Sequence, residues 1–530
     1  MNLGKIFFVL LATVLIQPLW SQDIQIESYS DENFVIQEIR LKEPSVGNNQ
    51  FEALIKNKTD EIKYVVIDVR TECLGIGNTN WQHQVIFQIN PLEERKLIDS
   101  YFICTPIIGR IRISFGESDR YFDRKKWMLL SQTERSKNPP PENKFFWRKI
   151  INGSDISVAE SPGRSITQLT SFLNDVTPDR LQTIKSSLPD LITKSRAVKN
   201  PLRARLNGLT LANRKVPKDF DPQPGQWTYG SAKIKTNLER FKIKADVFTI
   251  SGEGETRIAA CFVSAASDFS QKKPLVILLS GNPPGTKESL INAAMYFASR
   301  GYHAITMDRR ESARTLDSKE KFIPNFTDPV YDARRLLDYL VWNPDYNIGK
   351  IGIYGISAGA GESMLTTILD DRIDAAVLAC GTTSFNQLFK NDGWIPTLSG
   401  MIIYPELGLG NPAVGKLSTL EFWEYFEKAK PEHNAKAKEI YTDLFPEFED
   451  LDPEKNAPLI APVPCFIVSG ARDDQFNPAG VVEVDLAMQK AYEEYDLPEC
   501  SELFIQSRAG HIVNLQAAGL IAVFFDRWLK

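Results

Sequence analysis

The chain contains 530 residues, enough for at least two folded domains with large cores. Hydrophobic residues make up 43% of it and charged residues 24%, so neither a wholly disordered chain nor a fibrous repeat fits. The net charge is −5 and no basic run occurs, which argues against nucleic acid as a partner.

The N-terminus has the three-part pattern of a secretory signal. Lys5 precedes an apolar run, Ile6 to Ile16, and the sequence turns polar after Ser21. We expect residues 1–21 to be removed and the mature protein to be secreted or periplasmic; a retained N-terminal anchor is the alternative. The apolar run is shorter than the ~18 residues of a transmembrane helix, and no later stretch approaches that length, so no stable membrane span is expected.

Residues 22–135 have the pattern of a small antiparallel β-sandwich. Apolar and polar residues alternate in runs such as 51–55, 64–69 and 85–89, with Asn, Gly, Asp and Glu between them. Cys73 and Cys104 both fall in this stretch and are the expected disulfide pair of an exported protein.

The remaining cysteines are expected to carry no metal. Cys261, Cys380 and Cys465 stand in apolar runs and are expected to be buried in the core, whereas Cys500 has no assigned role. No Cys and His cluster has zinc-like spacing.

Residues 136–232 are expected to form a linker with a helical segment. Pro139, Pro140 and Pro141 can continue neither a sheet nor a helix. The stretches 166–173, 181–192 and 202–211 then carry apolar residues at helical spacing.

Residues 233–530 have the pattern of an α/β domain. Solidly apolar strands are expected at 275–279, 304–307, 351–354, 375–379 and 465–468. Helices such as 330–342 alternate with them, as in a parallel sheet covered on both faces. No repeat of 20 to 50 residues occurs, which disfavours propellers and solenoids.

A G-x-S-x-G motif, Gly355 to Gly359, directly follows one of these strands and directly precedes a helix-forming run. The glycines permit a sharp turn that holds the hydroxyl of Ser357 clear of the sheet at a helix N-terminus. Ser357 is therefore the candidate nucleophile.

A serine nucleophile needs a general base that a carboxylate orients. Of the four histidines, His511 lies in the loop between the last apolar strand and the final helix and is the expected base. Asp473 follows the preceding strand and is the expected carboxylate, with Asp474 as its competitor. The order Ser, Asp, His along the chain is typical of one hydrolase architecture.

Acyl transfer also requires two donors for the developing oxyanion. The backbone N–H of Ala358 is one candidate. The loop after strand 275–279 should supply the other, where Gly281 and Asn282 have an N–H but Pro283 and Pro284 do not. Asn282 is favoured, and a turn without a ligand role is the alternative.

These motifs make residues from about 250 to 530 resemble the α/β-hydrolase superfamily, in particular its dienelactone-hydrolase, acetyl-xylan-esterase and prolyl-oligopeptidase-like branches. The matching pieces are Gly355–Gly359, Gly470–Asp473, Gly510–His511 and the closing run 524–529. The resemblance implies the same roles for Ser357, Asp473 and His511. One departure is Ser280, where many relatives carry His.

A long insertion, about residues 382–462, is expected to form a helical cap over the site, and a packed helical decoration is the alternative. Arg309 and Arg310 follow strand 304–307, where they could contact an anionic substrate or form a structural ion pair.

We therefore expect an exported serine hydrolase that cleaves a small-molecule or glycan-linked carboxylic ester through an acyl-enzyme, with no cofactor. One alternative is a prolyl-oligopeptidase-like peptidase. The other is a non-catalytic carbohydrate- or partner-binding protein, which the β-sandwich would serve.

Overall fold

A computed structural model of the chain divides it into two compact units, residues 1–165 and 166–530. Each unit is described by itself. The structure describes residues 24–530 except 27–28, 43–46, 73–79, 104–108, 120–144, 157–172, 175, 198–200, 212–213, 215–216, 229, 266–268, 282–284, 311–318, 391–449, 474 and 508.

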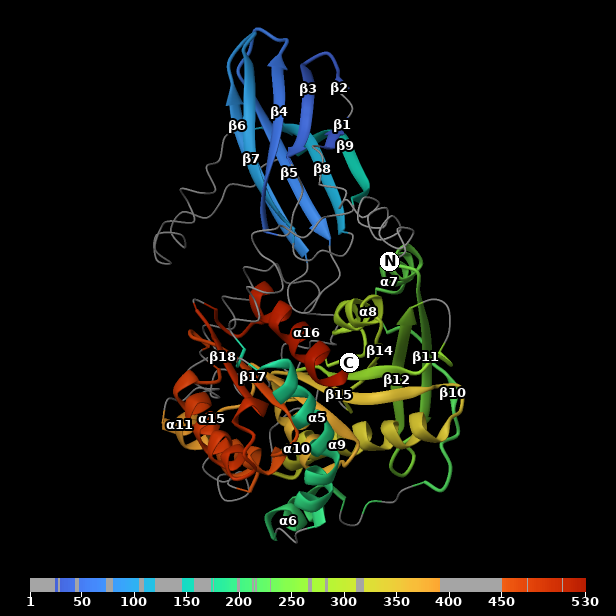
Figure 1. The fold of residues 1–530 in the computed structure, drawn as a ribbon. Helices are drawn as coiled ribbons and strands as arrows, with labels where there is room; N and C mark the ends of the chain where they lie inside the picture. Colours follow the sequence, from blue (N-terminus) through green and yellow to red (C-terminus); the bar gives the residue numbers. More distant parts are fainter. Residues whose placement is uncertain are drawn as a thin grey trace, which may run out of the picture. The chain divides into compact units, whose positions relative to one another are not determined.

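The first unit consists of two antiparallel sheets (Figure 1). One has the order β1-β3-β4-β7 with β2 paired to β3, and the other has the order β6-β5-β8-β9. The strands are β1 (Ile24–Ile26), β2 (Tyr29–Ser30), β3 (Phe34–Lys42), β4 (Gly47–Asn57), β5 (Lys63–Glu72), β6 (Asn80–Ile89), β7 (Glu94–Ile103), β8 (Gly109–Ser118) and β9 (Phe145–Ile156).

The two sheets pack through apolar side chains that alternate along the strands. Phe51 of β4 and Phe115 of β8 are buried, and their ring centroids lie 6.0 Å apart. Along β4, Phe51, Ala53 and Ile55 are buried, and the residues between them are less buried. Because alternating strands bury one face each, the result is the predicted β-sandwich.

The predicted end of this unit at residue 135 was wrong. Strand β9 lies inside the expected linker and pairs antiparallel with β8, from Phe145 opposite Ser118 to Ile156 opposite Gly109. The sheet therefore gains one more strand from the part of the chain that follows the proline run in the sequence.

The helices expected in the linker belong to the second unit. The stretches expected at 181–192 and 202–211 correspond to α5 (Pro178–Ala197) and α6 (Pro201–Leu211). The unit also contains α7 (Ser231–Arg240), which was not predicted, and residues 166–172 of the remaining stretch lie outside the described residues. Arg203 of α6 donates to the backbone carbonyl of Ile368 at 2.6 Å, and the Asn174 N–H donates to the Glu502 carboxylate at 2.8 Å. These contacts make residues 174–211 part of the unit rather than a spacer.

A nine-stranded sheet forms the centre of the second unit, in the order β10-β11-β12-β14-β13-β15-β16-β17-β18. The first strands pair antiparallel up to β14, and the rest are parallel. The strands are β10 (Gln223–Pro224), β11 (Ile243–Ser251), β12 (Arg257–Ala265), β13 (Lys273–Leu279), β14 (His303–Met307), β15 (Ile348–Ile356), β16 (Ile373–Ala379), β17 (Cys465–Gly470) and β18 (Ser501–Gln506).

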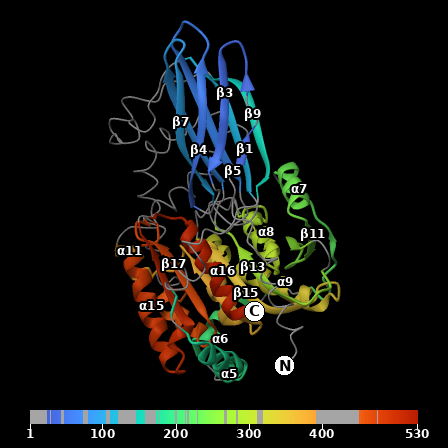
Figure 2. The same ribbon diagram turned by 45° about the horizontal axis from the view of Figure 1, so that its top comes forward.

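Helices cover both faces of this sheet (Figures 1 and 2). Two glycines of β15 show that α16 and α10 lie on opposite faces. A Cβ on Gly352 would meet Phe525 and Leu529 of α16. A Cβ on Gly355 would meet Gly359 and Ser363 of α10. The helices and short turns are α8 (Ile291–Ser299), α9 (Lys319–Trp342), α10 (Ala358–Leu369), α11 (Phe385–Lys390), α14 (Pro453–Asn456), η3 (Ala457–Ile460), α15 (Pro478–Glu493), η4 (Pro498–Cys500) and α16 (Leu515–Leu529).

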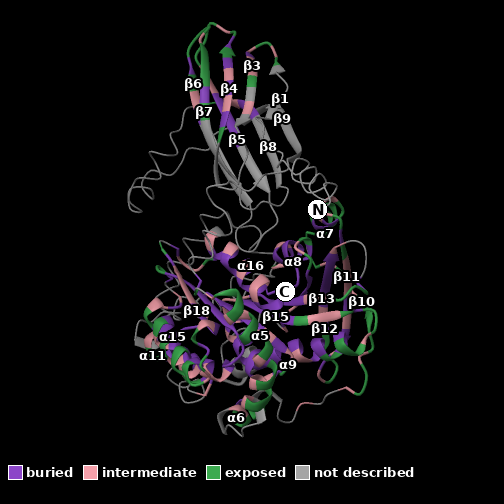
Figure 3. Cartoon of the chain, viewed as in Figure 1, coloured by how far each residue is buried: buried purple, intermediate pink, exposed green. Residues whose placement is uncertain are grey.

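The apolar runs predicted to be parallel strands correspond to β13, β14, β15, β16 and β17, so the predicted α/β architecture is confirmed. These strands are buried over most of their length (Figure 3). Polar residues therefore collect where the strands end.

Several predictions fall outside the described residues: the signal 1–21, the Cys73–Cys104 disulfide, and most of the cap insertion, of which 391–449 are not described. The cysteines that are described, Cys261, Cys380, Cys465 and Cys500, are free and buried. None of the helices in the described part is both long and apolar enough to cross a membrane.

Candidate active site

Ser357 stands at the sharp turn between β15 and α10. Its backbone dihedrals are φ 58° and ψ −128°, a conformation that L-residues rarely adopt. The Ser357 N–H donates to the Ala379 carbonyl at the end of the neighbouring strand β16, at 2.9 Å. That bond holds the turn against the sheet.

The glycines of the motif are needed because backbone segments approach closely at this turn. A Cβ on Gly355 would lie 1.9 Å from the Gly359 carbonyl oxygen, and one on Gly359 would lie 2.2 Å from the Leu279 carbonyl oxygen. Neither position has room for a side chain, since real Cβ atoms do not come so close. The G-x-S-x-G spacing thus brings the start of α10 directly against the end of β13.

His511 joins Ser357 to Asp473. Its Nε2 lies 2.9 Å from Ser357 Oγ, and its Nδ1 lies 3.0 Å from Asp473 Oδ2. The three residues come from loops after β15, β17 and β18, which end at the same edge of the parallel part of the sheet. Asp473 is buried, and the His511 side chain is 19% exposed, so the histidine is open to solvent on one side.

Asp473 is held in place by its own loop. Its second oxygen, Oδ1, accepts hydrogen bonds from the N–H groups of Gln475 at 3.0 Å and Phe476 at 2.9 Å. The Phe476 ring stacks on His511 with centroids 5.4 Å apart and planes 16° apart. This segment therefore orients both the carboxylate and the imidazole.

Two residues that sequence reasoning did not assign to the site support the histidine loop. Gln506 donates from Nε2 to the Ile512 carbonyl at 2.8 Å and accepts from the Asn514 N–H at 2.7 Å. The Cys380 thiol donates to the same Ile512 carbonyl at 3.3 Å. Burial raises the pKa of the Cys380 thiol to about 12, so it remains a neutral donor. Gln506 is a polar residue that ends an apolar strand, which is the one local signal that could have indicated it.

The other described histidines, His303 and His83, belong to strands. His303 is buried in β14, with Nδ1 2.9 Å from Ser264 Oγ and Nε2 2.9 Å from the Gln271 carbonyl. Burial lowers the pKa of His303, so the ring is neutral and structural. His83 belongs to β6 in the first unit.

Of the two oxyanion candidates, Ala358 is the first residue of α10, where helix N–H groups have no acceptor within the helix. Asn282 lies outside the described residues. Its neighbour Gly281 is described, and a Cβ there would lie 2.6 Å from Ser357 Cβ. The start of the loop after β13 is therefore next to Ser357. Asp474, the competitor of Asp473, is not described.

Arg309 and Arg310 both form ion pairs. Arg309 donates from Nη2 to Glu362 of α10, and both side chains are buried. Arg310 donates to both carboxylate oxygens of Asp332 in α9, at 2.8 and 2.5 Å. Of the two roles expected for these arginines, contact with an anionic substrate or a structural ion pair, the structure supports the ion pair.

Within the described ranges, no group of three or more His, Cys, Asp or Glu side chains could hold a metal ion. The cluster around Ser357 instead combines a hydroxyl, an imidazole and a carboxylate in hydrogen-bond contact. Such a cluster can move a proton from the hydroxyl to the imidazole.

A mostly parallel sheet, covered by helices on both faces and carrying a serine at a strand-to-helix turn, defines the α/β-hydrolase fold. No protein-family profile matches the sequence, and no curated protein matches it.

Solved structures similar to this chain include three esterases. An acetyl xylan esterase from Paenibacillus sp. R4 aligns at 14% identity with a TM-score of 0.38, over 69% of this chain and 100% of that one. A glucuronoyl esterase from Solibacter usitatus aligns at 13% identity with a TM-score of 0.40, over 63% and 93%. Acetyl xylan esterase 1 from Thermoanaerobacterium sp. JW/SL YS485 aligns at 14% identity with a TM-score of 0.33, over 66% and 93%.

Proposed function

We propose that this protein is a secreted serine hydrolase that cleaves a carboxylic ester through an acyl-enzyme. The observation that supports it is the contact of His511 with Ser357 on one side, at 2.9 Å, and with Asp473 on the other, at 3.0 Å. The ester is the substrate class that the sequence resemblance implies.

Each of the three residues has one role. Asp473 accepts from the Nδ1–H of His511, which leaves Nε2 unprotonated and able to accept the Ser357 proton. Ser357 Oγ attacks the ester carbonyl carbon, and the carbonyl oxygen becomes an oxyanion that accepts from the Ala358 and Asn282 N–H groups.

The intermediate then collapses with loss of the alcohol. The C–O bond to the alcohol breaks, and the imidazolium returns its proton to the leaving oxygen. Water attacks the acyl-enzyme with His511 again as base, which releases the acid and restores Ser357. The steps balance without a cofactor.

The test is release of p-nitrophenol from acetyl, butyryl and octanoyl esters, with a proline-linked peptide amide assayed alongside. We expect Ser357→Ala to lower kcat by about 10⁵-fold or more. Ser363→Ala is the matched control, because Ser363 lies buried in α10, the helix that directly follows Ser357, and it should retain activity. An initial burst of p-nitrophenol would identify the acyl-enzyme.

The outcomes separate the rival functions. Cleavage of the amide alone would replace the esterase with the peptidase. No turnover, together with no labelling of Ser357 by a fluorophosphonate, would reject the hydrolase and favour the binding protein.

A further inference from the structure

Arg309 lies just beyond the end of β14 and contacts two separate parts of the candidate site. Its backbone N–H donates to the Gly285 carbonyl at 2.8 Å, in the segment after β13. Its guanidinium donates to Glu362 in the second turn of α10. The two side chains are only 2% and 0% exposed, so this bridge is buried.

The first end of the bridge lies in the chain that follows β13, of which residues 281 and 285–287 are described. Gly281, at its start, lies next to Ser357. At its far end, Asp308 accepts from the Lys287 N–H at 2.6 Å and lies 3.4 Å from Lys287 Nζ. Asp308 and Arg309, just after the neighbouring strand β14, thus hold Lys287 and Gly285.

The second end of the bridge is α10, the helix that begins at Ala358. Glu362 is fully buried in it, and burial raises the pKa of this carboxyl to about 7, against the lowering effect of Arg309. A buried carboxylate without its partner is strongly destabilised, so the pair fixes where α10 stands. The position of the Ala358 N–H depends on that placement.

We propose that Arg309 is a positioning residue that sets where the N-terminus of α10 lies relative to Gly285. The proposal rests on the proposed function, in which the Ala358 N–H at the start of α10 is an oxyanion donor. Each such donor contributes about 10²- to 10³-fold to kcat, and a displacement of about 1 Å costs much of that effect. Arg309 therefore acts on the transition state more than on substrate binding.

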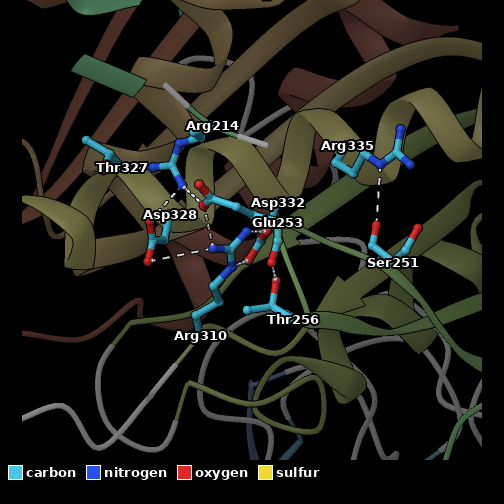
Figure 4. A network of polar contacts seen from close by, with 9 residues as sticks. All are labelled: Arg214, Ser251, Glu253, Thr256, Arg310, Thr327, Asp328, Asp332 and Arg335. Atoms are coloured by element: carbon cyan, nitrogen blue, oxygen red, sulfur yellow. Dashed lines mark hydrogen bonds and ion pairs between the residues drawn. The ribbon is translucent and has the colours of Figure 1, made fainter. Parts of the chain in front are cut away.

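The next residue, Arg310, provides a matched control (Figure 4). Its side chain, 11% exposed, forms an ion pair with Asp332, and its Nη1 donates to Glu253 at 3.1 Å. Arg214 completes this network through Glu253 and Asp328. These partners belong to the β11–β12 turn, to α9 and to the chain before β10, which hold no residue of the candidate site.

The test compares Arg309→Met, Arg309→Lys and Arg310→Met in the full chain. Kinetics on p-nitrophenyl acetate are measured at a temperature well below the thermal unfolding midpoint of each variant. A second readout is the rate at which a fluorophosphonate labels Ser357, in which the Oγ–P bond forms, the P–F bond breaks and His511 takes the proton.

We expect Arg309→Met to lower kcat and the labelling rate by about 10- to 100-fold while KM changes less than about 3-fold. Arg309→Lys should recover part of the loss because it restores a charge opposite Glu362. Arg310→Met should lower the unfolding midpoint but leave kcat and labelling within about 2-fold of wild type.

Equal effects of Arg309→Met and Arg310→Met on kcat would overturn the positioning role and leave the proposed function standing. A wild-type protein that is neither labelled nor active would overturn both. If Arg309→Met does not fold, the double variant Arg309→Met/Glu362→Met replaces it, because it removes the contact without leaving a buried charge unpaired. An unchanged kcat in that variant would also overturn the proposal.

Discussion

Gln506 donates from its Nε2 to the backbone carbonyl of Ile512, at 2.8 Å. Gln506 is the last residue of β18, and Ile512 directly follows His511. The hydrogen bond therefore closes the loop that carries the imidazole, and it does so from the rigid end of a central-sheet strand rather than from another loop.

Gln506→Glu should lower kcat by about 10-fold or more, because a carboxylate opposite a carbonyl oxygen loses the donor and repels the loop. Cys380→Ala removes only the weaker thiol donor to the same carbonyl, so its loss should be smaller. Steady-state kinetics on p-nitrophenyl acetate check the order. A larger effect of Cys380→Ala would contradict this account of the loop.

Asp473→Asn should lower kcat by about 10⁴-fold, because an amide in place of the carboxylate favours the wrong histidine tautomer. Asp474→Asn is the matched change one residue away and should leave kcat within a few-fold. The same ester assay decides between them, and a reversed order would assign the triad carboxylate to Asp474.

Two glycines of α10 should respond in opposite directions to alanine. At Gly359 the new Cβ would lie 2.2 Å from Leu279 O, so Gly359→Ala should destabilise the protein by about 1–3 kcal/mol and displace Ser357. At Gly361 nothing lies within 4 Å of the new Cβ, and alanine should stabilise the helix by about 0.5–1 kcal/mol. Urea unfolding measures both, and a stabilising Gly359→Ala would refute the packing argument.

Asp485 should make stability depend on pH. It is 4% exposed in α15, and burial raises its pKa to about 6, although Gln489 donates to it at 2.7 Å. The folded state therefore binds this proton more tightly than the unfolded state, and stability falls as pH rises from about 4 to about 6.

Asp485→Asn removes the ionisable group, so it should stabilise the protein more at pH 8 than at pH 4.5, by on the order of 2 kcal/mol. Glu493→Gln, at an exposed position of the same helix, is the matched control variant. Equal effects of Asp485→Asn at both pH values would mean that Asp485 does not titrate in this range.

Much of the second unit could be predicted because its signals are local. Continuous apolar runs indicated β13 to β17, and the motif around Ser357 indicated a strand-to-helix turn that the structure contains. Chain order then led to Asp473 and His511, and the structure brings both into contact with Ser357.

The features that sequence reasoning missed depend on contacts between distant residues. Nothing in the residues around Phe145 says that β9 will pair with β8 after a proline run. Likewise, the sequence around Glu362 indicates only a helix. The ion pair with Arg309 forms because the order of the strands in the sheet brings the two residues together. Burial of a charge depends on tertiary packing, which a local pattern does not contain.

The unusual backbone of Ser357 also affects any attempt to engineer this protein. A non-glycine residue at φ 58° and ψ −128° carries a strain of about 1–3 kcal/mol, which glycine would relieve. A library ranked by thermal tolerance alone would therefore enrich glycine at position 357 and discard the hydroxyl with it. Directed evolution of this chain needs an assay for hydrolysis in every round of selection.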